Sequence, residues 1–74
     1  MNIGMLWLDA DSHRTFEEKV KRAADYYSNK YGRKPELCLV NTHMIEGEKQ
    51  VGTIQVQPAK NVLPHHFWLG MKAI

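Results

Sequence analysis

One segment of this chain has the period of an amphipathic helix, and the segments on either side of it read as strands. Between residues 15 and 31 the apolar side chains recur at steps of three and four, which places them in one stripe along a helix. A single helix can cover only one face of a sheet. The chain is therefore expected to leave a second sheet face that the helix does not reach. The stripe consists of Phe16, Val20, Ala23, Ala24, Tyr27 and Tyr31.

Both ends of this helix carry recognisable signals. Thr15 stands three residues before Glu18, which is the capping-box pattern of a helix start. Gly32 can adopt the left-handed conformation that closes a helix, and Pro35 prevents its continuation. These signals predict a helix that follows Thr15, with a start one turn earlier as the alternative.

Four segments are predicted to be strands, which gives the order β-α-β-β-β. The first is apolar in both registers, so we expect it to end near Asp9 and to lie centrally in the sheet. The third is expected to form a hairpin with the second. The fold class that follows is α+β: one small domain over residues 1–74, with a four-stranded mixed sheet and one helix packed on one face. The four segments are residues 2–9, 36–44, 51–57 and 65–74.

The last strand begins with two adjacent histidines, His65 and His66, in the stretch "VLPHHFWLG". In a regular strand neighbouring side chains point to opposite faces. The pair therefore cannot bind one metal ion, and we predict a structural role for it. Alternation places His65, Phe67, Leu69 and Met71 on the core side and His66, Trp68, Gly70 and Lys72 on the other.

Composition excludes several classes of protein. The single cysteine, Cys38, rules out an internal disulfide framework and a CxxC zinc site, and its place within a strand predicts a buried, inert thiol. No apolar run approaches the length of about 18 residues that a membrane span requires. The first residues lack the basic segment of a secretory signal, so a cytoplasmic location is expected.

The best candidate for catalysis is Asp9 with Asp11, at the end of the first strand and before the helix. Two carboxylates in this position can hold Mg²⁺ against a phosphate, which would make the protein a metal-dependent phosphodiesterase or nuclease. In the structural reading, Asp9 merely ends the strand and Asp11 caps the following turn. We favour that reading, and we assign no catalytic residue, no metal and no cofactor.

Positive charge is concentrated in and after the helix. Residues 14–34 contain seven Lys or Arg and three Asp or Glu, a local charge of +4 within a chain whose net charge is +2. A solvated helix face is the preferred reading, and binding to nucleic-acid phosphates is the alternative. The residues that would carry such binding are Lys19, Arg22, Lys30, Arg33 and Lys34.

The sheet face without a helix gives the leading functional hypothesis. Apolar side chains occur on both sides of the first and last strands, so a large apolar surface remains exposed whichever side the helix takes. We therefore predict a non-enzymatic interaction module that forms a homo-oligomer or docks on a protein partner. Trp7 and Trp68 are the predicted interface residues, because tryptophan is favoured at protein interfaces.

Over nearly its whole length the chain resembles a group of short prokaryotic proteins of uncharacterised function. The resemblance lies in "GMLWLD", "YYSNKYGRKPELCLV" and "VLPHHFWLG". It implies a compact domain and transfers no catalytic residue.

Overall fold

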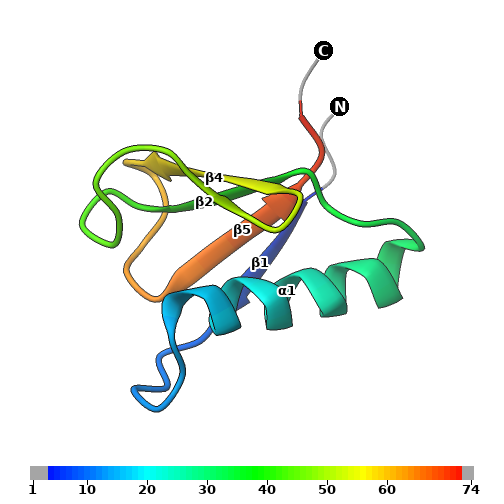
Figure 1. The fold of residues 1–74 in the computed structure, drawn as a ribbon, viewed down its shortest axis with the longest axis horizontal. Coiled ribbons are helices and arrows are strands. Elements are labelled where there is room, and N and C mark those ends of the chain that lie inside the picture. Colours follow the sequence, from blue (N-terminus) through cyan, green and yellow to red (C-terminus); the bar gives the residue numbers. More distant parts are fainter. Residues whose placement is uncertain (1–3, 73–74) are drawn as a thin grey trace.

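One helix lies against one side of a mixed five-stranded sheet in the computed structural model, which describes residues 4–72 (Figure 1). The predicted α+β fold is confirmed, but the predicted number of four strands is wrong. The third predicted segment, residues 51–57, spans the turn between two strands, and the additional strand lies mostly before it, at residues 49–51. The elements are β1 (Gly4–Leu8), α1 (Phe16–Tyr31), β2 (Leu37–Asn41), β3 (Lys49–Val51), β4 (Ile54–Ala59) and β5 (His66–Gly70).

The ends of α1 follow the signals in the sequence. The Thr15 hydroxyl accepts a hydrogen bond from the backbone N–H of Glu18, and the Glu18 carboxylate accepts one from the N–H of Thr15. Gly32 closes the helix with a φ of 75°, in the left-handed region that favours glycine. The capping box is thus confirmed, and the alternative start one turn earlier is wrong.

The strands are arranged in the order β1-β5-β2-β4-β3. The last strand, β5, lies between β1 and β2 and runs antiparallel to both, so β1 and β2 are parallel without touching. The prediction that the first strand lies centrally is wrong, because β1 forms an edge of the sheet. The neighbouring strand β5 is an interior strand, and its Phe67 and Leu69 are fully buried, whereas Leu6 and Leu8 of β1 are each 61% exposed.

The hairpin of this sheet joins β3 to β4 and not β2 to β4 as predicted. Val51 pairs with Ile54, so the turn contains only Gly52 and Thr53. Gly52 has a φ of 60°, as a tight two-residue hairpin turn requires at its first central position. The chain reverses direction in the segment before β3 and again at Gly52, and β4 therefore lies parallel to β2.

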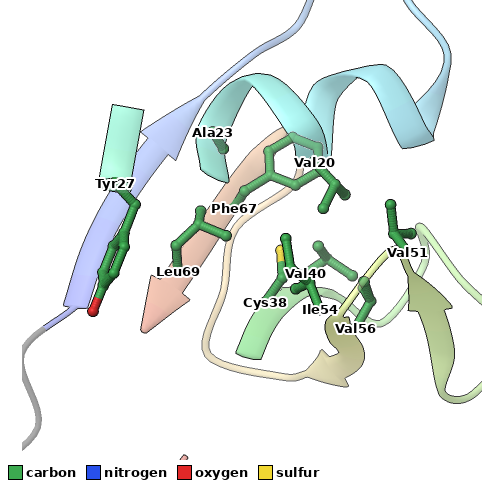
Figure 2. Packing of buried hydrophobic residues seen from close by; sticks show 10 residues of the cluster. All are labelled: Val20, Ala23, Tyr27, Cys38, Val40, Val51, Ile54, Val56, Phe67 and Leu69. Carbon is green, nitrogen blue, oxygen red and sulfur yellow. The ribbon is translucent and has the colours of Figure 1, made fainter. Parts of the chain in front are cut away.

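The core lies between α1 and the inner face of the sheet (Figure 2). The helix contributes three of its members, and the strands contribute the others. Met5 and Trp7 of β1 pack against this cluster from the edge, so β1 also has a covered side. The buried residues are Val20, Ala23, Tyr27, Cys38, Val40, Val51, Ile54, Val56, Phe67 and Leu69.

The start of β5 departs from the regular alternation predicted for it. His65 has a φ of 66°, so the chain turns at this residue and the strand begins at His66. The prediction that His65 lies on the core side is wrong, because its side chain is exposed. Met71 follows the strand and also leaves the predicted core side, since it lines a hollow on the other face of the sheet.

Trp68 lies across two glycines on the face of the sheet that α1 does not cover. Gly4 of β1 pairs with Gly70 of β5. A Cβ atom added at Gly4 would lie 2.1 Å from the indole carbon Cζ2, and one added at Gly70 would lie 2.4 Å from Cη2. The ring therefore fills the space that two side chains would otherwise occupy.

Replacement of Gly70 by alanine is expected to lower the free energy of unfolding by about 1–3 kcal/mol, because the new methyl group displaces the indole. Urea denaturation of wild type, G70A, W68A and the double variant measures this. In W68A the methyl group has room, so the cost of G70A should largely disappear there. Equal costs in both backgrounds would contradict this packing.

Candidate functional site

The face of the sheet away from α1 is apolar at its centre and uncharged throughout the strands. We call it the open face. Paired positions place Leu6, Trp68 and Leu39 in one row across β1, β5 and β2. Further along, β4 contributes Gln55 and Gln57 to this face, and β3 contributes Gln50. No side chain that the described strands present here is Asp, Glu, Lys or Arg.

The open face contains a hollow of about 470 Å³. Its floor is formed by strand residues, and one wall is formed by the segment between β4 and β5. Asn41 holds that wall in place, because its side-chain Nδ2 donates a hydrogen bond of 2.9 Å to the Val62 carbonyl. Leu63, the next residue, is 67% exposed. The lining residues are Leu6, Leu37, Leu39, Asn61, Val62, Trp68 and Met71.

The sequence predicted two tryptophans at the uncovered face, and the structure places one of them there. Trp68 lies on the open face, but Trp7 lies on the helix side, where its ring centroid is 4.3 Å from that of Tyr26. The prediction that Trp7 lies on the uncovered face is therefore wrong. Trp7 pairs with Phe67, whose side chain is buried under α1, so both point to the covered side. The indole Nε1 of Trp7 is buried without a hydrogen-bond partner.

The aliphatic residues of the open face were not among the predicted site residues. Alternation along β1 does separate Leu6 and Leu8 from Trp7, so their common side was visible in the sequence. Which side the helix would cover was not visible. The contributions of Leu37 and Leu39 depend on the pairing of β2 with β5, which the sequence does not specify.

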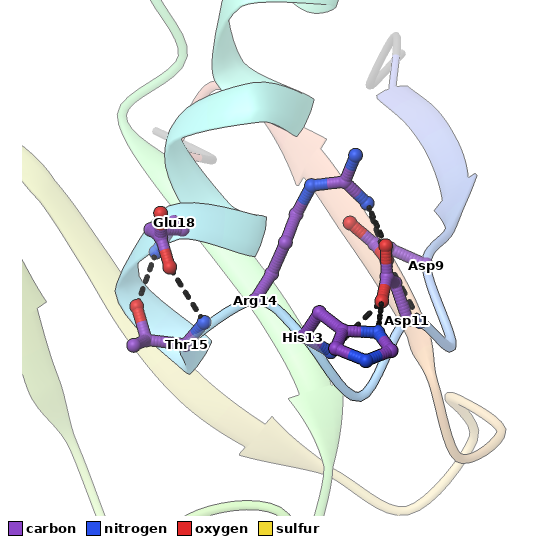
Figure 3. A network of polar contacts seen from close by, with 6 residues as sticks. All are labelled: Asp9, Asp11, His13, Arg14, Thr15 and Glu18. Atoms are coloured by element: carbon purple, nitrogen blue, oxygen red, sulfur yellow. Dashed lines mark hydrogen bonds and ion pairs between the residues drawn. The ribbon is translucent and has the colours of Figure 1, made fainter.

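Asp9 and Asp11 converge on Arg14 (Figure 3). Arg14 Nη1 lies 2.8 Å from Asp11 Oδ2 and 3.6 Å from Asp9 Oδ1. Asp9 Oδ1 also accepts a hydrogen bond from the Asp11 backbone N–H, while its buried Oδ2 has no partner. The cation that Asp9 and Asp11 share is therefore the guanidinium group of Arg14.

Asp11 also organises the turn that leads into α1. Its Oδ1 accepts a hydrogen bond of 2.8 Å from the backbone N–H of His13 and lies 3.2 Å from the His13 ring nitrogen Nδ1. The His13 N–H, and more weakly its ring and Arg14, hold the pKa of Asp11 below its usual value. Among residues 4–72 no group of three or more His, Cys, Asp or Glu is placed to hold a metal ion.

The five predicted phosphate-binding residues lie in two places. Lys19, Arg22 and Lys30 follow one flank of α1, and Arg33 and Lys34 are exposed beyond the helix end. None of the five forms an ion pair with another described residue. None of the five belongs to a strand of the open face. The carboxylate of Glu48 does contact that face, because it accepts a hydrogen bond from the Gln55 side chain.

A scan of protein-family models and searches of curated proteins and of solved structures found no match to this chain. The resemblance to short prokaryotic proteins therefore stays a prediction. The helix of the described part of the chain is too short and too polar to cross a membrane.

Replacement of Arg14 by methionine is expected to lower the free energy of unfolding by about 1–3 kcal/mol, because it leaves the carboxylate of Asp9, which is only 6% exposed, without its cation. Thermal or urea denaturation measures the change. The further substitution D9N should restore most of the loss, since it removes the buried charge. The matched variant K21M, on an exposed position of α1, should be nearly neutral; a similar loss in K21M would contradict this account.

Burial raises the pKa of the Cys38 thiol from its usual 9.0 to about 12. The folded protein should therefore react with a thiol reagent at mildly alkaline pH only through unfolding, and the rate should rise sharply in denaturing urea. Because the folded pKa is the higher one, the thiol's contribution to stability is complete below pH 9.0 and declines as the pH rises towards 12. Immediate labelling of the native protein would contradict the burial of Cys38.

Proposed function

We propose that this protein is a non-enzymatic interaction module that self-associates through its open face. The observation that carries the proposal is a sheet surface opposite the only helix of residues 4–72, with an apolar centre and no Asp, Glu, Lys or Arg on its strands. Leu6 and Leu8 are each 61% exposed there, and Leu63, which follows Val62 of the hollow's wall in the chain, is 67% exposed. Contiguous apolar surfaces of this kind mark interaction sites.

A second copy of the same chain is the occupant that the chemistry of this face favours. In a two-fold dimer each interface residue faces the same surface of its partner, so a charged face would bring like charges together. The open face has no formal charge on its strands and avoids this cost. A standard dimer takes about 800 Å² from each partner, about a sixth of the 5098 Å² that this chain exposes.

The two alternative functions have weaker support. A metal-dependent nuclease would need Asp9 and Asp11 free for the metal, whereas Arg14 lies between them. Nucleic-acid binding would rest on cations divided between the α1 flank and the segment after Gly32. We place the module in the cytoplasm, in keeping with a lone thiol that forms no disulfide.

Light scattering coupled to size exclusion tests the proposal at micromolar protein concentration. The wild type should have a mass near twice the 8.6 kDa of one chain. L39E, which places a charge at the centre of the open face, should give a monomer that is still helical by circular dichroism. T53E introduces the same charge in the exposed hairpin turn and should remain a dimer. A wild-type mass near that of one chain would contradict self-association.

A further inference from the structure

The sheet has two edges, and only one of them is protected. β3 is three residues long and carries Lys49, which is paired with Glu17 of α1. Short edge strands with a lysine resist pairing with foreign strands. β1 is five residues long and contains no charged residue and no proline. The Tyr31 hydroxyl donates to the Gly4 carbonyl over 3.5 Å, and beyond that contact the outer edge of β1, at Leu6 and Leu8, is open to another strand.

One hydrogen bond shows which residues of β1 direct their backbone N–H and C=O groups to the outer edge. The Asp9 N–H donates to the His65 carbonyl over 2.9 Å, so these two residues form a hydrogen-bonded pair of the β1–β5 ladder. Bonded and non-bonded pairs alternate in antiparallel sheets. Trp7 therefore directs its N–H and C=O towards β5, whereas Leu6 and Leu8 direct theirs outwards, away from the sheet.

The helix flank beside this edge is basic. Lys19, Arg22, Tyr26 and Lys30 follow one another at steps of three or four and so share one side of α1. Tyr26 stacks on Trp7 of β1, which places this side of the helix next to the β1 edge. The three cations take part in no ion pair among residues 4–72. We call these four residues the basic flank.

The nearby acidic groups do not neutralise the basic flank completely. Glu18 is engaged in the capping box, and Asp11 is engaged by His13 and Arg14. Asp25 is exposed and lies three residues from Arg22. A surplus of positive charge therefore remains along the β1 edge.

We propose that the free edge of β1 docks an extended segment of a partner protein in which acidic and aliphatic residues alternate. Addition of a strand would satisfy the outward backbone groups of Leu6 and Leu8. Side chains on one side of that strand would point towards the basic flank, which favours Asp or Glu. Side chains on the other side would lie next to Leu6 and Leu8 on the open face, which favours Val, Ile or Leu.

The charge of the basic flank argues against a second copy of this chain at the same edge. A two-fold pairing of β1 with β1 would bring Lys19, Arg22 and Lys30 towards the same residues of the other copy. Like charges at an interface cost several kcal/mol in general. The edge thus favours a different occupant from the open face, and this inference does not depend on self-association.

Fluorescence anisotropy with a labelled peptide tests the proposal. The probe is a capped peptide of about nine residues with alternating Val and Glu, and the matched control alternates Val and Lys. The Val–Glu peptide should bind at least about tenfold more tightly, and its affinity should fall as salt is added. Equal binding of the two peptides, or no binding of either at low salt, would overturn the proposal.

Two substitutions separate the backbone contribution from that of charge. L8P removes an outward N–H together with the Leu8 side chain, a change that an edge strand tolerates, and should abolish peptide binding while the circular dichroism spectrum is kept. R22E should reduce the preference for the Val–Glu peptide several-fold or reverse it. This variant tests the proposal even if L8P does not fold. K21E makes the same charge change on the other flank of α1 and should bind like wild type. Unchanged binding by R22E would overturn the role of the basic flank.

The same variants distinguish this site from the dimer of the open face. L39E should lose the dimer and keep peptide binding, whereas R22E should lose the preference for the Val–Glu peptide and keep the dimer. A wild type that is monomeric but binds the Val–Glu peptide would refute self-association alone. Loss of the dimer in L8P together with unchanged dimerisation of L39E would show that a second copy occupies the β1 edge, and would overturn the proposal.

Discussion

The packing of Phe67 and Leu69 beneath α1 is the contact on which the remaining structure depends. Both side chains are fully buried on an interior strand of the sheet, and the ring of Phe67 lies 5.9 Å from that of Phe16 on the helix. With these two residues turned inwards, Trp68 between them must point outwards. Its indole then requires glycine at both positions beneath it, Gly4 and Gly70. The burial of Phe67 and Leu69 on β5 thus determines which residues lie at and beneath Trp68 on the opposite face.

The molecule presents chemically different surfaces around β1. Its inner side packs on the core through Met5 and Trp7, its outer side exposes Leu6 and Leu8, and its free edge lies beside the positive flank of α1. The open face suits a neutral partner of the same shape, whereas the edge suits an extended acidic chain. The two proposed occupants thus use different main contacts, but both would lie against Leu6 and Leu8 and would share that part of β1.

The local features of the fold were predictable from the sequence, and the features set by distant pairing were not. The helix and its capping box depend on residues within one turn of each other, such as Thr15 and Glu18, and both predictions are confirmed. The place of β5 between β1 and β2 depends on contacts across most of the chain, and it made the prediction of a central first strand wrong. The position of Trp7 was wrong for the same reason: alternation shows which residues share a side, but only tertiary packing shows which side is covered.

The position of β5 between β1 and β2 has a consequence for the order in which the chain can fold. The segment that joins β1 to the other strands is residues 66–70, which the ribosome makes after the other elements of residues 4–72. Until it emerges, β1 has no partner strand and α1 has no Phe67 or Leu69 to cover. Cooperative folding must therefore wait until synthesis of these residues, and the nascent chain exposes apolar strand edges during that interval. A chaperone that binds extended apolar segments would meet this protein before any partner of the finished domain could.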